Sequence, residues 1–208
     1  MNKVARYTAR SYSVQADTYE HKWRKYIEHT HRALINELVL KTNDRICDLS
    51  SGTGLFTYAI LEKEPNLKEI RLNDLSTKML EISQNRFSED DRITFSNQAS
   101  NTIHDSIQFL NTIISLNAFH NYVSQKEVVA SIFEALNVGG TVYILDWNNQ
   151  GWFRFINYFI KLFVKEHIDT RSEAEMNKML REAGFKISST KSWYWRYWNF
   201  YLIKAQKP

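Results

Sequence analysis

The sequence predicts an α/β fold in which a mostly parallel β-sheet is covered by helices on both faces. Short apolar segments alternate along the chain with amphipathic segments, and this order is typical of parallel strands joined by crossover helices. The chain has 208 residues but only two prolines and six glycines, so we expect no long disordered linker. A chain of this length folds by default around one core, which predicts a single domain over residues 1–208.

The first predicted elements form a helix–strand–helix unit. Apolar residues recur at helical spacing in residues 23–40, which predicts an amphipathic helix. Residues 45–49 are a short apolar run typical of a strand, and the small residues 50–54 predict a turn after it. A helix follows at residues 55–61 and ends before Pro65.

Two further strands are predicted at residues 69–73 and 92–95. Between them, Ser76 is a favourable N-cap for a helix at residues 77–87. The isoleucine-rich residues 111–116 predict a fourth strand.

The second half of the chain continues the alternation. Residues 124–136 predict a helix ended by the pair Gly139-Gly140, and residues 141–145 predict a fifth strand. The remaining predicted elements are helices at residues 151–163 and 172–183 and strands at residues 185–190 and 197–204.

One edge of the predicted sheet is the expected functional region. Ligands of open α/β sheets bind beyond the carboxyl ends of the strands. The loops that reach this edge follow Leu49, Asn73, Phe95, Leu116 and Leu145. We therefore expect the binding residues in these loops.

The loop after the first strand combines an acid with two glycines. Asp48 ends the strand, and Gly52 and Gly54 follow it. Glycine permits a positive φ and a close approach of a ligand to the backbone, and the next helix offers free amide groups. This predicts a site for an anionic or polar group. The alternative is a tight strand-to-helix connection without a ligand.

The loop after the second strand carries a further acid, Asp74. In dinucleotide-binding folds, an acid at this place accepts hydrogen bonds from ribose hydroxyls. The alternative role is to cap the next helix, but Ser76 already fits that role. We therefore favour the ribose interpretation.

Four segments then resemble one family. ICDLSSGTGLF (46–56) and NDLSTKML (73–80) resemble the first and second motifs of class I S-adenosylmethionine-dependent methyltransferases. LNVGGTV (136–142) and MLREAGF (179–185) resemble the segments before the family's fifth and sixth strands. The resemblance covers about residues 12–207. It implies a Rossmann-like, seven-stranded sheet with an antiparallel last strand, with S-adenosylmethionine as cofactor and S-adenosylhomocysteine as product.

The resemblance also implies roles for single residues. Asp74 would bind the ribose, Leu75 would press on the adenine, and Asn117 would lie near the methionine part. The residues implied for the amino-acid end of the cofactor are Asp48, Ser50, Gly52 and Gly54. Gln98 and Ala99 match the pair that contacts the adenine amino group.

The chain departs from the family at two of these positions. Ser50 stands where the family usually has glycine, and Gln98 stands where many members have an acid. A glutamine carbonyl still accepts the hydrogen bond of the adenine amino group. A cofactor-binding protein without catalysis is therefore the alternative to an enzyme.

Residues 1–40 are an expected N-terminal helical cap, and residues 12–23 within it match the variable leading segment of the family. There a tyrosine-rich helix folds over the cofactor, which makes Tyr12 and Tyr19 candidate lid contacts. Ordinary packing of a surface helix is the alternative.

His120 is a weak candidate for a catalytic base. Methyl transfer from a sulfonium is an in-line displacement that needs mainly positioning, and a base is required only if the acceptor must lose a proton. His120 follows the fourth strand, and its usual pKa suits proton transfer. We favour the alternative that His120 packs or caps the next helix.

Residues 151–170 are a candidate acceptor lid. Trp152, Phe155 and Phe159 belong to one broad apolar helix face, which suits a flat or apolar acceptor. Packing on the sheet is an equal alternative. A third is contact with a membrane surface, helped by the cations at positions 154, 161 and 165.

Composition and motifs exclude several other classes. A net charge of +4 is too small to indicate nucleic-acid binding, and no metal site is expected. The single cysteine, Cys47, cannot form an internal disulfide, which suits the cytoplasm. Residues 50–54 lack the full glycine fingerprint of a dehydrogenase.

The sequence therefore predicts a methyltransferase for a small, apolar or aromatic acceptor. A membrane-surface phospholipid or amine N-methyltransferase is the rival enzyme. The acceptor atom and the oligomeric state stay open.

Overall fold

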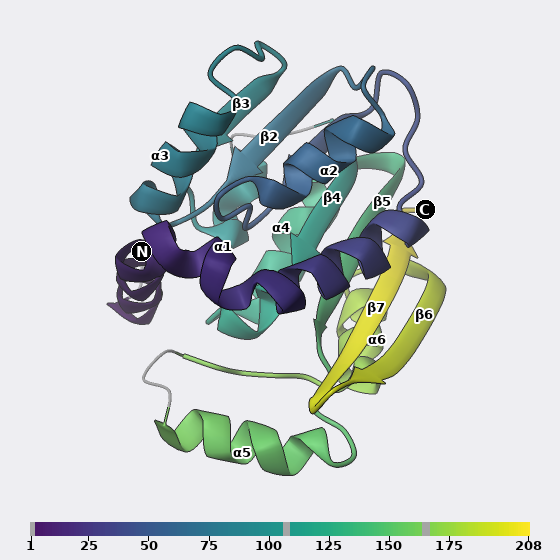
Figure 1. Ribbon diagram of the computed structural model, residues 1–208. Coiled ribbons are helices and arrows are strands. Elements are labelled where there is room, and N and C mark those ends of the chain that lie inside the picture. Colours follow the sequence, from purple (N-terminus) through teal and green to yellow (C-terminus); the bar gives the residue numbers. More distant parts are fainter. Residues whose placement is uncertain (1–2, 106–108, 164–166) are drawn as a thin grey trace.

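The computed structural model describes residues 3–105, 109–163 and 167–208 (Figure 1). Seven strands form one sheet in the order β3-β2-β1-β4-β5-β7-β6. The strands are β1 (Arg45–Asp48), β2 (Glu69–Asn73), β3 (Ile93–Ser96), β4 (Leu110–Leu116), β5 (Leu136–Trp147), β6 (Lys186–Trp195) and β7 (Trp198–Gln206). Neighbouring strands from β3 to β5 are parallel, and β7 is antiparallel to β5 and β6. The predicted fold class is confirmed.

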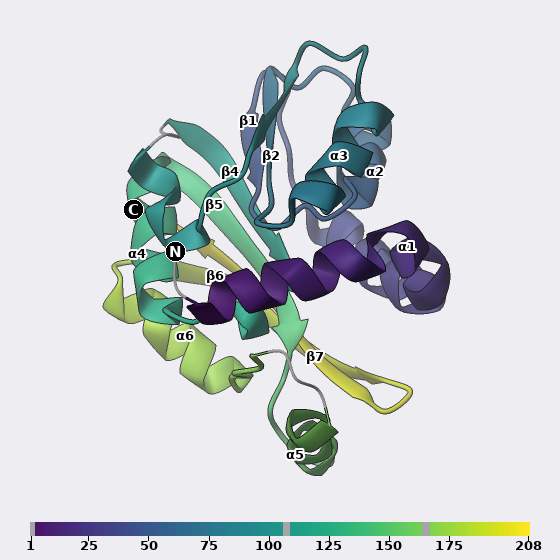
Figure 2. The ribbon, with the colours of Figure 1, turned by 90° about the vertical axis from the view of Figure 1, so that its left-hand side faces the viewer.

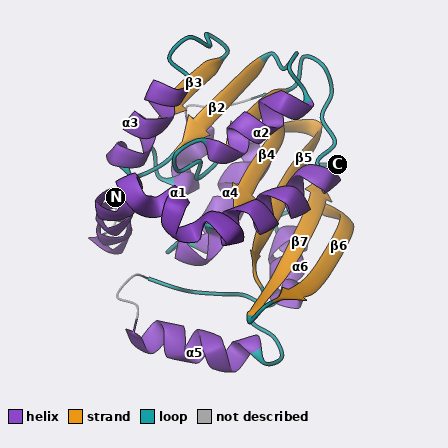
Figure 3. Ribbon diagram, viewed as in Figure 1, coloured by secondary structure: helices purple, strands orange, loops and turns teal. Residues whose placement is uncertain are grey.

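Helices cover both faces of this sheet (Figure 3). The helices of the described residues are α1 (Lys3–Glu37), α2 (Leu55–Lys63), α3 (Thr77–Arg86), α4 (Gln125–Ala135), α5 (Phe153–Phe163) and α6 (Glu173–Glu182), with short 3₁₀ helices η1 (Ser100–Asp105) and η2 (Phe119–Asn121). Of these, α5 lies beyond the end of the sheet (Figure 1). Alternate side chains of a strand serve opposite faces. Val142 of β5 packs with the cluster that contains α4 and α6 residues, whereas Tyr143 packs with the cluster that contains α1 and α2 residues.

The first helix is much longer than the predicted helix at residues 23–40. Its two halves run in different directions (Figures 1 and 2). The second half buries Ile27 and Leu34 in the core, but the first half buries only Thr8 and Ala16. Without a regular apolar stripe, the first half gives no strong periodic signal.

The fifth strand also differs from its prediction. It begins directly after α4, at Leu136, and includes Gly139 and Gly140. Gly139 has a φ of 79°, and the pairing of β4 with β5 shifts register between Leu110 and Thr112. The two glycines therefore form an irregularity within the strand, and they do not end the helix.

The sheet ends in a tight hairpin of β6 and β7. Arg196, at the turn, has a φ of 55°. Both strands are longer than predicted, because β6 and β7 pair with each other along nearly their whole length. No helix in the described part of the chain is long and apolar enough to cross a bilayer.

Candidate active site

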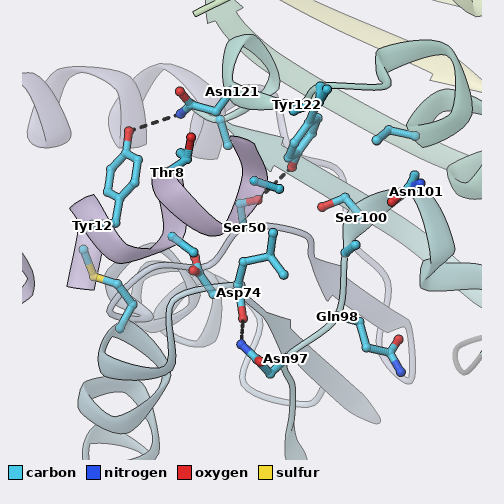
Figure 4. A pocket seen from close by; sticks show the side chains of 18 of the residues that line it. Thr8, Tyr12, Ser50, Asp74, Asn97, Gln98, Ser100, Asn101, Asn121 and Tyr122 are labelled. Carbon is cyan, nitrogen blue, oxygen red and sulfur yellow. Dashed lines mark hydrogen bonds between the residues drawn. The ribbon is translucent and has the colours of Figure 1, made fainter. Parts of the chain in front are cut away.

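A cavity of about 650 Å³ lies at the carboxyl ends of the parallel strands (Figure 4). The first half of α1 forms one wall, and the loops after β1 to β4 form the others. Most of the residues expected at the cofactor line it, namely Tyr12, Tyr19, Ser50, Gly52, Asp74, Leu75, Gln98, Ala99 and Asn117. The structure thus brings together residues that are distant in the sequence.

Asp74 joins the loops after β1 and β2. One carboxylate oxygen accepts the N–H of Gly52 at 2.9 Å, and the other accepts the N–H of Ser76 at 2.8 Å. Burial raises the pKa of Asp74, while these two amide bonds act in the opposite direction. Each oxygen retains acceptor capacity for a further donor, such as a ribose hydroxyl.

The two glycines of the first loop have different roles. Gly52 has a φ of 55°, lines the cavity, and a Cβ added there would meet nothing within 4 Å. Gly54 has a φ of 77°, and a Cβ there would lie 2.7 Å from the ring of Phe87. Gly52 therefore leaves space for a ligand beside the backbone, whereas Gly54 allows α2 to pack closely against its neighbours. Gly54 does not line the cavity.

Asp48 does not line the large cavity but lines a smaller one of about 60 Å³. Tyr19, Ser50, Gly52 and Asn117 line both cavities. Asp48 is 1% exposed and accepts a hydrogen bond from Thr57 Oγ1 at 3.3 Å. Burial raises the pKa of Asp48 to about 7.

Tyr122 and Asn73 support the site and were not predicted. The hydroxyls of Ser50 and Tyr122 share a hydrogen bond of 2.8 Å, so the serine at this position has a polar partner in the cavity wall. Asn73 Nδ2 donates to the carbonyls of Leu49 and Gln98, at 3.0 and 3.1 Å. Asn73 thereby ties three loops together. Its position at the end of β2 was the only available sequence signal.

Asn117 is held by the first helix. Its Oδ1 accepts the hydroxyl of Tyr26 at 3.0 Å, and its Nδ2 donates to Thr30 Oγ1 at 2.8 Å. Trp147 Nε1 donates to the same Tyr26 hydroxyl at 2.7 Å. This chain of bonds fixes the loop after β4 against α1 and the end of β5.

The structure does not bring His120 to the cavity. The side chain is 5% exposed and lines neither cavity. Its Nδ1 lies 2.6 Å from Asp146 Oδ1, and its ring stacks on Trp147 with a centroid distance of 4.0 Å. These contacts agree with the packing alternative, and a role as base stays a prediction.

The structure also places the expected acceptor lid elsewhere. Trp152, Phe155 and Phe159 are 68%, 63% and 58% exposed, and none of them lines the cavity. The opposite face of α5 contacts the body through Phe153 and Asn157, which are buried. In this structure α5 therefore does not cover the site. Residues 164–166, within the expected lid, lie outside the described residues.

Unused polar groups face the site. Thr8 Oγ1 and Ser51 Oγ are buried and have no hydrogen-bond partner among the described residues. Thr8 lines the large cavity, and Ser51 lines the small one. Tyr12 accepts a hydrogen bond from Asn121 Nδ2 at 3.1 Å (Figure 4). Buried polar atoms are rarely left unpaired, so the positions of Thr8 and Ser51 fit a polar ligand.

Together, Asp74, the bend at Gly52 and the polar cavity have the layout of a nucleoside-binding site. A family model for the methyltransferase domain matches residues 19–190. The chain belongs to this methyltransferase family. The resemblance to the class I enzymes is confirmed, and S-adenosylmethionine, the methyl donor of that class, is its cofactor.

Solved structures share the fold at low sequence identity. A methyltransferase of Haloferax volcanii in complex with the Trm112 activator is 15% identical, with a TM-score of 0.82 over 95% of this chain and 97% of that chain. Magnesium protoporphyrin IX methyltransferase from Synechocystis, with bound S-adenosylhomocysteine, is 16% identical, with a TM-score of 0.73 over 93% and 96%. No functionally curated protein matches the sequence.

Proposed function

We propose that this methyltransferase acts on a small organic acceptor with an apolar or aromatic part. One observation carries the proposal. A single cavity extends from Asp74 and Gly52 to Thr8, Tyr12 and Asn121, under the first half of α1. Its volume of about 650 Å³ lies within the range of small-ligand sites, roughly 300–1,000 Å³.

The cofactor end of this cavity fits S-adenosylmethionine. Gly52 would leave space beside the backbone for the amino-acid end, Asp74 would offer its oxygens to the ribose, and Leu75 would contact the adenine. The bound cofactor supplies a methyl group that is already activated on a sulfonium. The protein then contributes mainly by holding the acceptor in line with that methyl group.

The remainder of the cavity suits an acceptor of mixed polarity. The rings of Tyr12 and Tyr19 meet edge to face with centroids 6.1 Å apart. Leu116 and Val128 add apolar lining, whereas Thr8 offers an unpaired hydroxyl. This combination of aromatic walls and few polar groups is typical of sites for small molecules. The first half of α1 covers the cavity, which disfavours a macromolecular acceptor.

Methyl transfer to a small-molecule extract tests the proposal. The protein is incubated with S-adenosylmethionine carrying an isotope-labelled methyl group, and labelled products are detected by mass spectrometry. Asp74→Asn loses a charged acceptor, so its affinity for the cofactor, measured by calorimetry, is expected to fall about 10- to 100-fold. The matched control is Asp91→Asn, which changes an exposed acid.

Two results would contradict the proposal. Tight binding of the cofactor without a labelled product from any extract would favour a cofactor-binding protein without catalysis. Unchanged affinity in Asp74→Asn would remove Asp74 from the ribose role.

A further inference from the structure

Helix α5 exposes an unusually aromatic face. Five of its large apolar side chains, and that of Trp152 directly before it, are more than half exposed; the five are Phe155, Tyr158, Phe159, Leu162 and Phe163. The other exposed large apolar residues are spread over several elements. Scattered apolar residues are normal on a protein surface, but a continuous patch marks an interaction site.

The opposite face of α5 packs against the rest of the protein. Phe153 is fully buried, and its ring lies 5.7 Å from that of Trp198. Asn157 Nδ2 donates to Thr170 Oγ1 at 2.6 Å and to Asn149 Oδ1 at 3.2 Å. Rotation of the helix to bury its aromatic face would break these contacts. The aromatic face is therefore presented outward.

The charges of α5 favour an anionic partner. Arg154 and Lys161 are exposed, and the helix contains no acidic residue. A separation of two helical turns puts both cations on one stripe, between the buried Asn157 and the exposed Tyr158. Neither cation forms an ion pair with a carboxylate of the described residues. The aromatic face thus has a positive border.

We propose that α5 docks this aromatic face on the surface of an anionic lipid bilayer. Tryptophan and tyrosine favour the interface between hydrocarbon and headgroups, where an amphipathic helix lies in the plane of the membrane. Arg154 and Lys161 reach the lipid phosphates from the edge of that face. Lys165, which would add a third cation, lies outside the described residues.

The position of α5 gives the docking a direction. The helix follows the carboxyl end of β5, which is the same end of the sheet as the cavity. Docking on α5 therefore brings this end of the molecule toward the bilayer. The proposal does not depend on methyl transfer, because vesicle binding can be measured without the cofactor or an acceptor.

Flotation with lipid vesicles tests the apolar contribution. The full chain is expected to float with vesicles of phosphatidylglycerol and phosphatidylcholine. The double variant Phe155→Ser/Phe159→Ser is expected to bind these vesicles about tenfold more weakly or worse, because two large rings no longer insert. The matched control is Phe109→Ser, which removes a ring of similar exposure (65%) that precedes β4 at the opposite end of the sheet.

A charge variant tests the anionic preference. Arg154→Gln/Lys161→Gln is expected to bind the same vesicles about tenfold more weakly, whereas the control Lys41→Gln/Lys68→Gln is expected to bind like the unmodified chain. The two control lysines are exposed and precede β1 and β2, away from α5. Vesicles of phosphatidylcholine alone are expected to bind poorly.

Several outcomes would overturn the proposal. One is the absence of flotation, and another is equal flotation of the α5 variants and their controls. A third is a dimer that light scattering detects without lipid and that the Phe155→Ser/Phe159→Ser variant no longer forms. The aromatic face would then bind a second copy of the chain. Near-ultraviolet circular dichroism verifies that each variant is folded. Vesicle-dependent quenching by brominated lipid that disappears in Trp152→Phe would independently support insertion.

Discussion

At the scale of single residues, burial gives two ionisable groups near the site opposite effects on stability. Asp48 is buried and has no cationic partner among the residues that the structure describes, and burial raises its pKa to about 7. His31 lines the same small cavity, and burial lowers its pKa to about 4. Asp48 therefore favours the native state at low pH, whereas His31 favours it near neutral pH.

The substitution Asp48→Asn isolates the first effect. The carboxyl contributes stability that is present below about pH 4 and lost as the pH rises through about 7, whereas asparagine has no charge to bury. The free energy of unfolding of the variant, relative to the unmodified chain, is expected to increase over this range by up to about 4 kcal/mol. Urea unfolding at about pH 4.5 and about pH 7.5 measures it. An equal difference at both pH values would contradict a raised pKa.

At the scale of elements, the connection from β1 to α2 depends on one glycine for packing. Gly54 precedes α2 with a φ of 77°, and its missing side chain leaves room for Phe87 and Leu72. Close packing of α2 against the sheet thus limits which residue can stand there. The motif predicted a ligand role for Gly54, whereas the structure shows a packing role.

Gly54→Ala is expected to lower the free energy of unfolding by about 2–4 kcal/mol. About 1 kcal/mol is expected from the left-handed backbone, and the remainder from overpacking against Phe87. The control is Gly139→Ala, because Gly139 has a φ of 79° but open space around its Cβ position. Chemical unfolding of both variants separates the two costs. A similar loss in both would show that packing at Gly54 is unimportant.

At the scale of the whole molecule, the first half of α1 connects the cavity to the start of α3. Its side chains wall the cavity, and Ser13 shares a hydrogen bond of 2.8 Å with Ser76, the N-cap of α3. This half buries few apolar residues, so its local stability is expected to be low without a ligand.

S-adenosylmethionine is therefore expected to protect α1 selectively. Binding adds contacts to the cavity wall, and a ligand that binds only the native state stabilises it. Hydrogen exchange with mass spectrometry should show slower exchange at residues 5–19 at saturating cofactor, with little change in α6, which does not line the cavity. Unchanged exchange at residues 5–19 would argue against a covering role for this helix.

The alternation of apolar segments and the two strand-end acids were enough to predict the sheet and the edge of the sheet at which the cavity lies. Local spacing alone puts Asp48, Gly52 and Asp74 at the ends of adjacent parallel strands, because those ends meet at one edge. The membership of Asn73 and Tyr122 in the site could not be predicted in this way. Each depends on partners far away in the chain.

The sequence by itself thus determined the fold class through periodicity. The resemblance of four short segments indicated the methyltransferase family and predicted the loops that we expect to bind the donor. Only the tertiary structure decided that Tyr122 supports the cavity wall, that His120 is buried against Asp146, and that the aromatic face of α5 points outward. The physical reason is the same in each case. An amphipathic pattern shows that a segment has an apolar face, but only contacts between distant residues decide what that face meets.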